Sequence, residues 1–462
     1  MSSFAMVTLA EAAEISGGIT KNAKRSALPI QRPYLSVANV HFNRIDTNNL
    51  SNIGVNEAEI ARAQLMPGDL MVVEGNGSLS QLGRVAVWQG QVQGCLHQNH
   101  LIKVRPKPIA KSKWLLYWLM SSAGRRAIEA TASSTSGLHT LSLAKVGSLP
   151  TPIASLEEQE IAIAYIELHL SRLDETVATL QGIQAKLKQA RASILKAAVE
   201  GRLVETEAEL ARRNGVNYED ADALLIRSVA EKNRLFQESQ SQAGRRKIWK
   251  EPSRPECQDK SSLPEGWSIS SMDQIADVSG GLAKDSKITS GESLPYLRVA
   301  NVQRGRLELE HIKTIICPSD KVTSLLLKKG DVLLNEGGDR DKLGRCWVWN
   351  GEISRCIHQN HVFKARIALP AILPKYISYY CNTMGDTYFH NEGKQTTNLA
   401  SISLSKVRAL PIALPPAPEQ FRILAEIDRR FSVLDQIEAT VQTTLARCGL
   451  LRQAILKRAF RG

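Results

Sequence analysis

The chain contains two copies of one long segment, and this internal repeat limits its fold more than any other feature of the sequence. Residues 1–201 match residues 262–462, and residues 202–261 form an insert between the two copies. Two copies are too few for a solenoid, so they predict a molecule with internal pseudo-two-fold symmetry. The clearest matches are Tyr34–Val40 with Tyr296–Val302 and Cys95–His100 with Cys356–His361.

The first part of each copy mixes strand signals with helix signals. Short runs of β-branched and aromatic residues between Gly, Pro and Asp turns are typical of strands, and longer apolar segments are typical of helices. We therefore expect an α+β fold class, with a sheet at the core of each mixed domain. The expected strands are Leu35–Val40, Gly83–Trp88, Asp331–Leu334 and His361–Ala365, and the expected helices are Lys111–Ala130 and Pro374–Thr383.

The second part of each copy is a long helix with an apolar seam. Apolar residues recur at alternating steps of three and four, which is the a/d pattern of a coiled coil. We expect the two helices to bury each other's seams as antiparallel partners, with a mixed domain at either end; the alternative is that each helix packs only on its own domain. The predicted seam residues are Ile163, Ile166, Leu170, Leu173, Val177, Leu180, Leu424, Ile427, Phe431, Leu434, Val441 and Leu445.

Polar residues interrupt both seams, and such residues fix the register of a coiled coil at some cost in stability. They are Gln184 and Arg191 in one helix, and Glu438 and Arg452 in the other. Together these patterns divide the chain into a first mixed domain (1–150), a first spacer helix (151–201), a linker with an expected helix at 219–237 (202–261), a second mixed domain (262–411) and a second spacer helix (412–462).

The chain is basic, and the charge is concentrated on the mixed domains. Lys and Arg number 59 and Asp and Glu 46, which gives a net charge of +13. Residues 1–150 carry +7 of this excess and residues 262–411 carry +4. A basic excess of this size favours an anionic partner, most often nucleic acid, although a solvated basic surface would give the same sum. The distribution indicates that the mixed domains face phosphate and the helices face protein.

Motifs of common cofactor-dependent enzymes are missing from the sequence. There is no GxxxxGK[ST] phosphate loop, no HExxH, no CxxC and no Gly-rich turn suited to S-adenosylmethionine. Seven Cys without paired spacing are typical of free thiols in a reducing cytoplasm, which is the expected location. The longest apolar run, Trp114–Met120, is far too short for a membrane span, and no signal peptide is visible.

The sequence His-Gln-Asn-His at 97–100 and 358–361 is the strongest candidate for catalysis. Two His three residues apart would suit a metal site or a duplicated nuclease. In a strand, however, side chains at positions i and i+3 point to opposite faces, and no acidic cluster stands near in sequence. A structural role in the sheet or a polar edge at DNA is therefore favoured, and no metal is expected.

Two pairs of polar loops have matching flanks and different tips. Such divergence is typical of two readers of different sequences, and ordinary drift of surface loops produces the same pattern. Hydroxyl, amide and basic side chains in these loops are suited to phosphates and base edges. The residues expected to contact DNA are Asn76, Ser78, Arg84, His97, Ser134, Thr135, Arg340, Lys342, Arg345, His358, Lys394, Gln395 and Thr396.

Taken together, these residues resemble the specificity (S) subunit of type I restriction–modification systems, the HsdS family. The resemblance covers essentially the whole chain and rests on the duplicated recognition unit, the two long helices and three short motifs. The first copy lacks the Leu-Pro-x-Gly-Trp opening that the second copy has. The motifs are the exits Leu149–Pro150 and Leu410–Pro411, each followed by a Glu-Gln helix start, and the opening Leu263–Trp267.

The resemblance implies a non-catalytic, DNA-reading scaffold. Two target-recognition domains would each read one half of a bipartite double-stranded DNA site, and the antiparallel helices would set the gap. Two methyltransferase subunits are the implied partners and would bring S-adenosylmethionine and adenine methylation. Two restriction subunits, where present, would add ATP- and Mg-dependent translocation and cleavage, so this chain itself needs no cofactor.

Two other functions compete with this interpretation. One is a nuclease with twin His-Gln-Asn-His sites, and the other is a coiled-coil adaptor whose basic charge is incidental. Twin catalytic sites would keep both loop tips alike, which disfavours the nuclease. Charge on the mixed domains rather than on the helices disfavours the adaptor.

Overall fold

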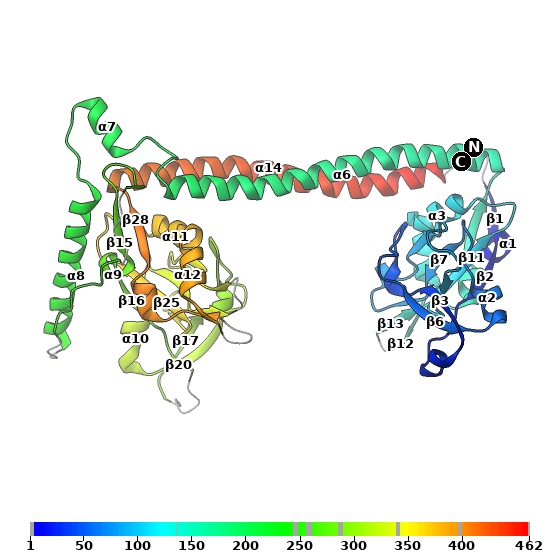
Figure 1. The fold of residues 1–462 in the computed structure, drawn as a ribbon, viewed down its shortest axis with the longest axis horizontal. Helices are drawn as coiled ribbons and strands as arrows, with labels where there is room; N and C mark the ends of the chain where they lie inside the picture. Colours follow the sequence, from blue (N-terminus) through cyan, green and yellow to red (C-terminus); the bar gives the residue numbers. More distant parts are fainter. Residues whose placement is uncertain are drawn as a thin grey trace. The chain divides into compact units, whose positions relative to one another are not determined.

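The chain folds into two compact units, each with one mixed domain and a share of both long helices (Figure 1). The first unit comprises Met1–Ile183 and Thr440–Gly462, and the second comprises Gln184–Ala439. Among the described residues, no helix is long and apolar enough to cross a membrane. The computed structural model describes residues 4–135, 137–243, 248–255, 261–284, 290–338, 342–395 and 400–460.

A four-stranded antiparallel sheet, in the order β2-β11-β7-β9, forms the core of the first unit. All four residues of β7 are buried, because the sheet is covered on both faces. Successive strand side chains alternate between faces, so Leu70 and Val72 join the core under α3 while Met71 and Val73 join the opposite cluster. The elements are β2 (Ala13–Gly17), β11 (Leu101–Pro106), β7 (Leu70–Val73), β9 (Val85–Val87) and α3 (Ser112–Met120).

Four smaller sheets complete the described part of the first mixed domain. One has the order β10-β3-β6 and contains a parallel pair, another pairs β1 with β14, a third has the order β12-β13-β8, and a fourth pairs β4 (Val40–His41) with β5 (Arg44–Ile45). The Pro-containing segment after Leu149 is therefore extended and is a strand of the domain. The strands are β10 (Leu96–His97), β3 (Ile30–Leu35), β6 (Ser51–Val55), β1 (Ala5–Thr8), β14 (Pro150–Ile153), β12 (Ser133–Thr135), β13 (Leu138–Thr140) and β8 (Gly75–Asn76).

The second mixed domain repeats this topology sheet by sheet. Its main sheet has the order β16-β25-β21-β23, and its smaller sheets have the orders β20-β17-β24, β15-β28, β22-β27-β26 and β18-β19, where β18 is Val302–Gln303 and β19 is Arg306–Leu307. The matching orders confirm the α+β internal repeat. The elements are β16 (Ala276–Ser279), β25 (Val362–Ile367), β21 (Val332–Asn335), β23 (Cys346–Val348), β20 (Lys313–Cys317), β17 (Glu292–Leu297), β24 (Ile357–His358), β15 (Ser268–Ser271), β28 (Pro411–Leu414), β22 (Gly337–Gly338), β27 (Ala400–Ser401), β26 (Lys394–Gln395) and α11 (Pro374–Thr383).

Two predicted elements differ in the structure for local reasons. The expected strand Leu35–Val40 ends at Leu35, because the Asn39 side chain accepts the Ser36 backbone N–H at 2.8 Å and folds the segment into a 3-10 turn, η2 (Val37–Asn39). The expected helix Lys111–Ala130 is two helices, because the Ser121 hydroxyl caps a new helix by accepting the Gly124 N–H at 3.1 Å. These helices are α3 and α4 (Ser122–Thr131).

The two long helices, α6 (Leu156–Val199) and α14 (Ala417–Ala459), pack against each other in both units. In the first unit, Arg458 lies over the Tyr165 ring and Arg452 forms an ion pair with Asp174, so the chains run antiparallel. Leu456 of α14 shares a core cluster with seam residues of α6, so the alternative of separate packing is wrong. Seam positions Ile163, Ile166, Leu170, Leu173, Ile427 and Val441 are buried, and Val177, Leu180, Leu424, Phe431, Leu434 and Leu445 are half-buried.

The polar residues that interrupt the seams find partners on the facing helix. Arg191 of α6 donates to Glu438 at 2.7 Å and also contacts Asp435 of α14 in the second unit. The Arg452–Asp174 pair plays the same part in the first unit. Because an ion pair forms only when its two members face each other, these pairs fix the register that the apolar seam alone would leave open.

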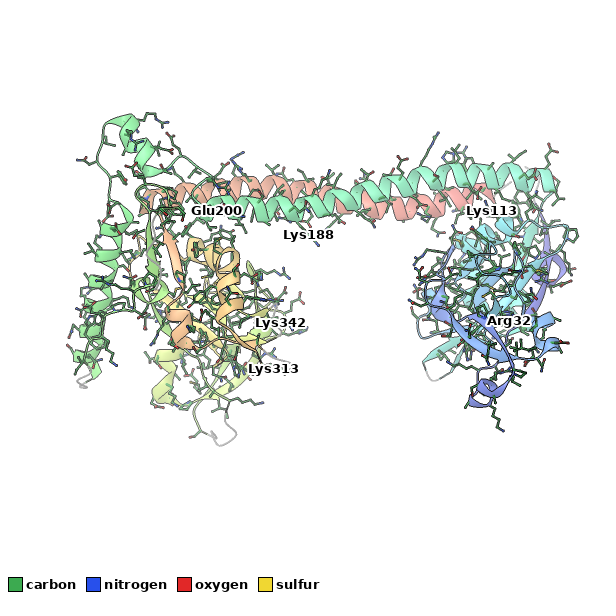
Figure 2. All side chains as sticks on the ribbon, in the orientation of Figure 1. Arg32, Lys113, Lys188, Glu200, Lys313 and Lys342 are labelled. Atoms are coloured by element: carbon green, nitrogen blue, oxygen red, sulfur yellow. The ribbon has the colours of Figure 1, made fainter. Side chains whose placement is uncertain are left out.

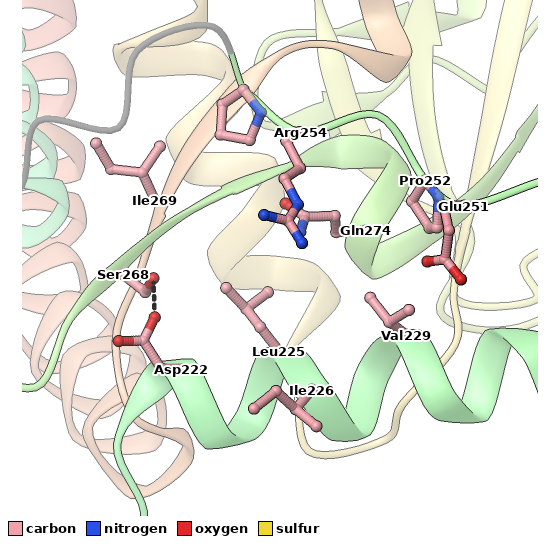
Figure 3. Close-up of a pocket in the computed structure, with 11 residues that line it drawn as sticks. Asp222, Leu225, Ile226, Val229, Glu251, Pro252, Arg254, Ser268, Ile269 and Gln274 are labelled. Atoms are coloured by element: carbon pink, nitrogen blue, oxygen red, sulfur yellow. Dashed lines mark hydrogen bonds between the residues drawn. The ribbon is translucent and has the colours of Figure 1, made fainter.

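The insert contains α7 (Glu207–Asn214) and α8 (Ala221–Ala243), and α8 packs on the second mixed domain. Leu224 is fully buried, the Ser228 hydroxyl donates to the Gln274 carbonyl at 3.0 Å, and Lys232 donates to the Ala276 carbonyl at 2.9 Å. A cavity of about 600 Å³ lies beside α8, with Arg254 over an apolar floor that includes Leu225 (Figure 3). The insert thus belongs to the packed structure of the second unit.

Candidate nucleic-acid interface

The two polar loops of the first domain, which are far apart in sequence, form one small sheet. Strand β8 pairs with β13, which places Asn76 opposite His139, and β13 pairs with β12, which places Ser134 opposite the same histidine. Ser134 and Ser78 are exposed, and the Asn76 carboxamide accepts the Ser78 backbone N–H at 2.9 Å. We call the sheet β12-β13-β8 the first recognition platform. The position of the Thr135 side chain lies outside the described residues.

The first recognition platform is anchored to the core of its domain at its base. The Leu141 N–H donates to the Glu74 carbonyl at 2.8 Å, and Leu141 itself is buried. The Glu74 carboxylate contacts His100 Nδ1 at 3.0 Å, at the point where β11 begins. The platform therefore presents polar groups on short strands whose ends are hydrogen-bonded to the core of the domain. Rigid support of this kind suits a recognition surface.

The second domain builds the same arrangement from different residues, β22-β27-β26, which we call the second recognition platform. The Ile402 N–H donates to the Glu336 carbonyl at 2.8 Å, and the Glu336 carboxylate contacts His361 at 2.6 Å. A Cβ atom at Gly337 would meet the Ala400 carbonyl oxygen at 2.7 Å, so this strand position requires glycine. Lys394 and Gln395 form β26; their side chains, and all of Arg340 and Thr396, lie outside the described residues.

Three of the predicted basic residues fall among the described side chains. Arg84 is half-buried, and its guanidinium donates to the Val37 carbonyl at 3.4 Å. Arg345, its counterpart in the repeat, donates to the Gln303 side chain. Lys342 and Lys313 lie on the same side of the second domain in the view of Figure 2. The two arginines are therefore partly committed to their own domains.

His97 and His358 cannot contact DNA as predicted, because both are fully buried. His97 Nδ1 lies 3.0 Å from the Ala63 carbonyl oxygen, and His358 Nδ1 lies 2.6 Å from that of Val362. Burial lowers the pKa of each imidazole to about 4, so both rings are neutral near pH 7. The structural interpretation of the His-Gln-Asn-His segments is the correct one for these two positions.

A buried polar network surrounds each of these histidines, and sequence analysis did not single it out. Asp69 accepts from Arg105 Nε at 2.7 Å and Nη2 at 2.8 Å, while Lys103 Nζ donates to the Arg62 carbonyl at 2.6 Å. The two cations of the network donate hydrogen bonds to carbonyl groups at the C-terminal end of helix α2 (Glu57–Ala63), where positive charge interacts favourably with the helix dipole. In the second copy, Asp331, Arg366 and Lys364 do the same for helix α10 (Ser319–Leu325). The sequence has a Lys-x-Arg pattern at these positions in both copies, and this pattern could have indicated the network.

The described groups of the platforms are suited to hydrogen bonding with a ligand. They offer hydroxyl, amide and backbone groups, which hydrogen-bond to phosphates and base edges. No group of three or more potential metal ligands occurs among the described residues. The buried pairs of His and Lys face backbone carbonyls of their own domains and do not open onto the platforms.

Two α+β domains with equivalent polar platforms, joined through two long paired helices, define a scaffold protein with two recognition surfaces. Solved structures share this fold along the whole chain. One, from a study entitled "Structural basis underlying complex assembly and conformational transition of the type I R-M system", superposes with a TM-score of 0.64 at 17% identity and covers 100% of this chain and 98% of that chain. The HsdS subunit from Thermoanaerobacter tengcongensis has a TM-score of 0.53 at 16% identity, with 100% and 97% coverage.

Sequence comparison leads to the same class of protein. Residues 264–447 match the family model "Type I restriction modification DNA specificity domain". The EcoKI specificity subunit of Escherichia coli K12 is 24% identical over 93% of this chain and 82% of its own length, and the StySPI specificity subunit of Salmonella potsdam is 24% identical over 96% and 86%. The second copy thus matches the model of the type I restriction modification DNA specificity domain, and the chain is similar over most of its length to type I restriction enzyme specificity subunits.

Proposed function

We propose that this chain is the DNA-specificity subunit of a type I restriction–modification enzyme. Each mixed domain binds one half of a bipartite double-stranded DNA site through its recognition platform. The observation that carries the proposal is the duplication of that platform: the same three-strand frame occurs once in each domain, built from different tip residues. A shared frame with different tips is suited to reading two different half-sites.

The catalytic chemistry resides in partner subunits under this proposal. Two methyltransferase subunits supply S-adenosylmethionine and methylate adenine, and two restriction subunits, where present, supply ATP- and Mg-dependent cleavage. The relatives named as specificity subunits of type I restriction enzymes support this division of labour. This chain contributes recognition and a scaffold, and no catalytic residue of its own is required.

The structure disfavours the two competing functions. A nuclease that used both histidines of each His-Gln-Asn-His segment would need both at the surface, whereas the first of each pair, His97 and His358, is buried and neutral near pH 7. An adaptor that uses only the helices would not need two anchored polar platforms on the mixed domains. The DNA-reading scaffold accounts for both features.

Mapping of methylated adenine tests the proposal directly. In a host that expresses the cognate methyltransferase subunit, we expect methylation at a split sequence only when this chain is present. Replacing Asn76 and Ser134 together with alanine should relax the sequence at one half-site and leave the other half unchanged, because only the first platform is altered. Methylation that is the same with and without the chain would contradict the proposal.

Salt dependence tests the basic contacts of the second platform. Replacing both Lys342 and Lys394 with alanine should reduce the magnitude of the slope of log K against log[salt] by about two, since each phosphate contact contributes about one. Lys188→Ala is the matched control, because Lys188 is an exposed lysine of α6 that lies away from the second recognition platform within the same unit (Figure 2). If the double variant leaves the slope unchanged, as the Lys188→Ala control should, then these two lysines do not contact the DNA.

A further inference from the structure

In the second unit, the start of α14 is covered by the insert. The chain leaves α6 through Gly201, and Leu203 enters the core beside Trp267. The Glu419 carboxylate accepts the Glu207 backbone N–H at 2.8 Å and the Trp267 indole N–H at 2.8 Å. Glu419 is fully buried as a result, and Glu207 also forms an ion pair with Arg422 at 2.6 Å.

The equivalent place in the first unit has no such cover from the described residues. By the repeat, Glu158 corresponds to Glu419, Ile161 to Arg422 and Phe4 to Trp267. Glu158 is exposed where Glu419 is buried, and Ile161 is 65% exposed on α6. These residues border a groove of about 380 Å³, which we call the α6 groove and which is lined by Phe4, Glu158, Ile161, Ala162, Tyr165, Arg458 and Ala459.

The α6 groove is more apolar than its covered counterpart. Ile161 stands where the second unit has Arg422, and Tyr165 stands where it has Glu426. Arg458 lies over the Tyr165 ring at 5.7 Å and has no ion pair with any residue in the described part of the chain. An occupant would therefore meet an apolar floor, the Arg458 guanidinium and the exposed Glu158 carboxylate, whose Oε2 already accepts the Ser155 N–H at 2.9 Å and the Ser155 hydroxyl at 2.8 Å, so that Oε1 is the oxygen left for an occupant.

We propose that the α6 groove binds a segment of a partner protein that reproduces the cover seen in the second unit. The segment presents two adjacent apolar side chains followed by a helix whose first backbone N–H groups meet Glu158, as Leu203, Val204 and α7 do in the second unit. It carries an apolar residue opposite Ile161, in place of Glu207, and an acidic residue for Arg458. Charge complementarity and the internal template together define this occupant, and the inference does not depend on DNA binding.

A fluorescent peptide of residues 202–215 with the substitution Glu207→Leu is a suitable probe, because leucine matches Ile161. Titration with the full chain, followed by anisotropy, should give saturable binding. Ile161→Asp should weaken binding by at least about tenfold, since it places a charge against an apolar side chain that would otherwise be buried. The unsubstituted peptide should bind more weakly than the E207L peptide.

Matched controls make the test decisive. Ile226→Asp changes a residue that is 73% exposed on α8 of the second unit, and it should leave binding unchanged. The E207L peptide with the further change Leu203→Asp should lose binding. Absence of saturable binding, or equal binding to the full chain and to its Ile161→Asp variant, would overturn the proposal. Self-association that Ile161→Asp abolishes would also overturn it, and would assign the α6 groove to a second copy of this chain.

Discussion

Replacing Asp331 with alanine is expected to lower the free energy of unfolding of the second unit by about 3–5 kcal/mol. Asp331 is buried, and its carboxylate accepts from Arg366 Nε and Nη2 at 2.7 Å each and from the Lys328 N–H at 2.7 Å. Removing it leaves the Arg366 guanidinium without its anion and a backbone N–H without an acceptor. Breaking one side of a buried pair is costly for this reason, whatever the net value of the intact pair.

Urea denaturation followed by tryptophan fluorescence measures this loss. Asp69→Ala should produce a similar loss in the first unit, because Asp69 makes the equivalent bonds to Arg105 and to the Met66 N–H. Glu336→Ala is the control: Glu336 pairs with the exposed side chain of His361, and an exposed pair contributes about 0–1 kcal/mol. A loss from Asp331→Ala no larger than that of the control would show that the buried network does not support the fold.

Acid should destabilise both units between pH 6.5 and pH 4 through His97 and His358. Burial lowers the pKa of each ring to about 4 in the folded state, whereas the unfolded chain titrates near 6.5. The unfolded chain therefore binds more protons in this window, so stability is present above pH 6.5 and falls as the pH drops toward 4. Each histidine accounts for roughly 3 kcal/mol of this loss, at 1.36 kcal/mol per unit of pKa.

The histidine contribution is separable from that of the carboxylates, which titrate lower. The variant with His97→Phe and His358→Phe should be less stable at pH 7, because it gives up two hydrogen bonds, but its stability should fall less steeply from pH 6.5 to 4. His100→Gln with His361→Gln is the control, since both residues are exposed, and it should keep the steep fall. Equal slopes for the Phe variant and the unmodified chain would contradict the assignment.

Long periodic patterns and the repeat were sufficient to predict the architecture. Pro374–Thr383 is a helix at the predicted bounds, and every predicted seam residue is at least half-buried. Short elements were not predictable in the same way. Leu35–Val40 has the composition of a strand, and only the side-chain bond from Asn39 to the backbone turns it into a 3-10 segment. One local polar contact outweighed strand propensity there.

The candidate site was predicted in part. Sequence analysis found both halves of each platform but not that they pair, because strands of two or three residues carry too little periodicity to predict pairing. It also left two roles open for His97 and His358, a structural role in the sheet and a polar edge at DNA, and the second of these is wrong. Their burial depends on carbonyl acceptors contributed by segments such as the end of α2, which local sequence does not reveal.

The separation of each recognition platform from the buried polar network has an evolutionary consequence. The groups that hold the fold together, such as Asp69 and Asp331, lie inside each domain, whereas tip residues such as Ser78 and Ser134 are exposed. Substitutions at the tips therefore carry a small thermodynamic penalty, and most remain compatible with folding. A lineage under selection to change its target sequence can therefore substitute the tip residues of each platform independently, because these substitutions leave the buried network that supports the fold intact.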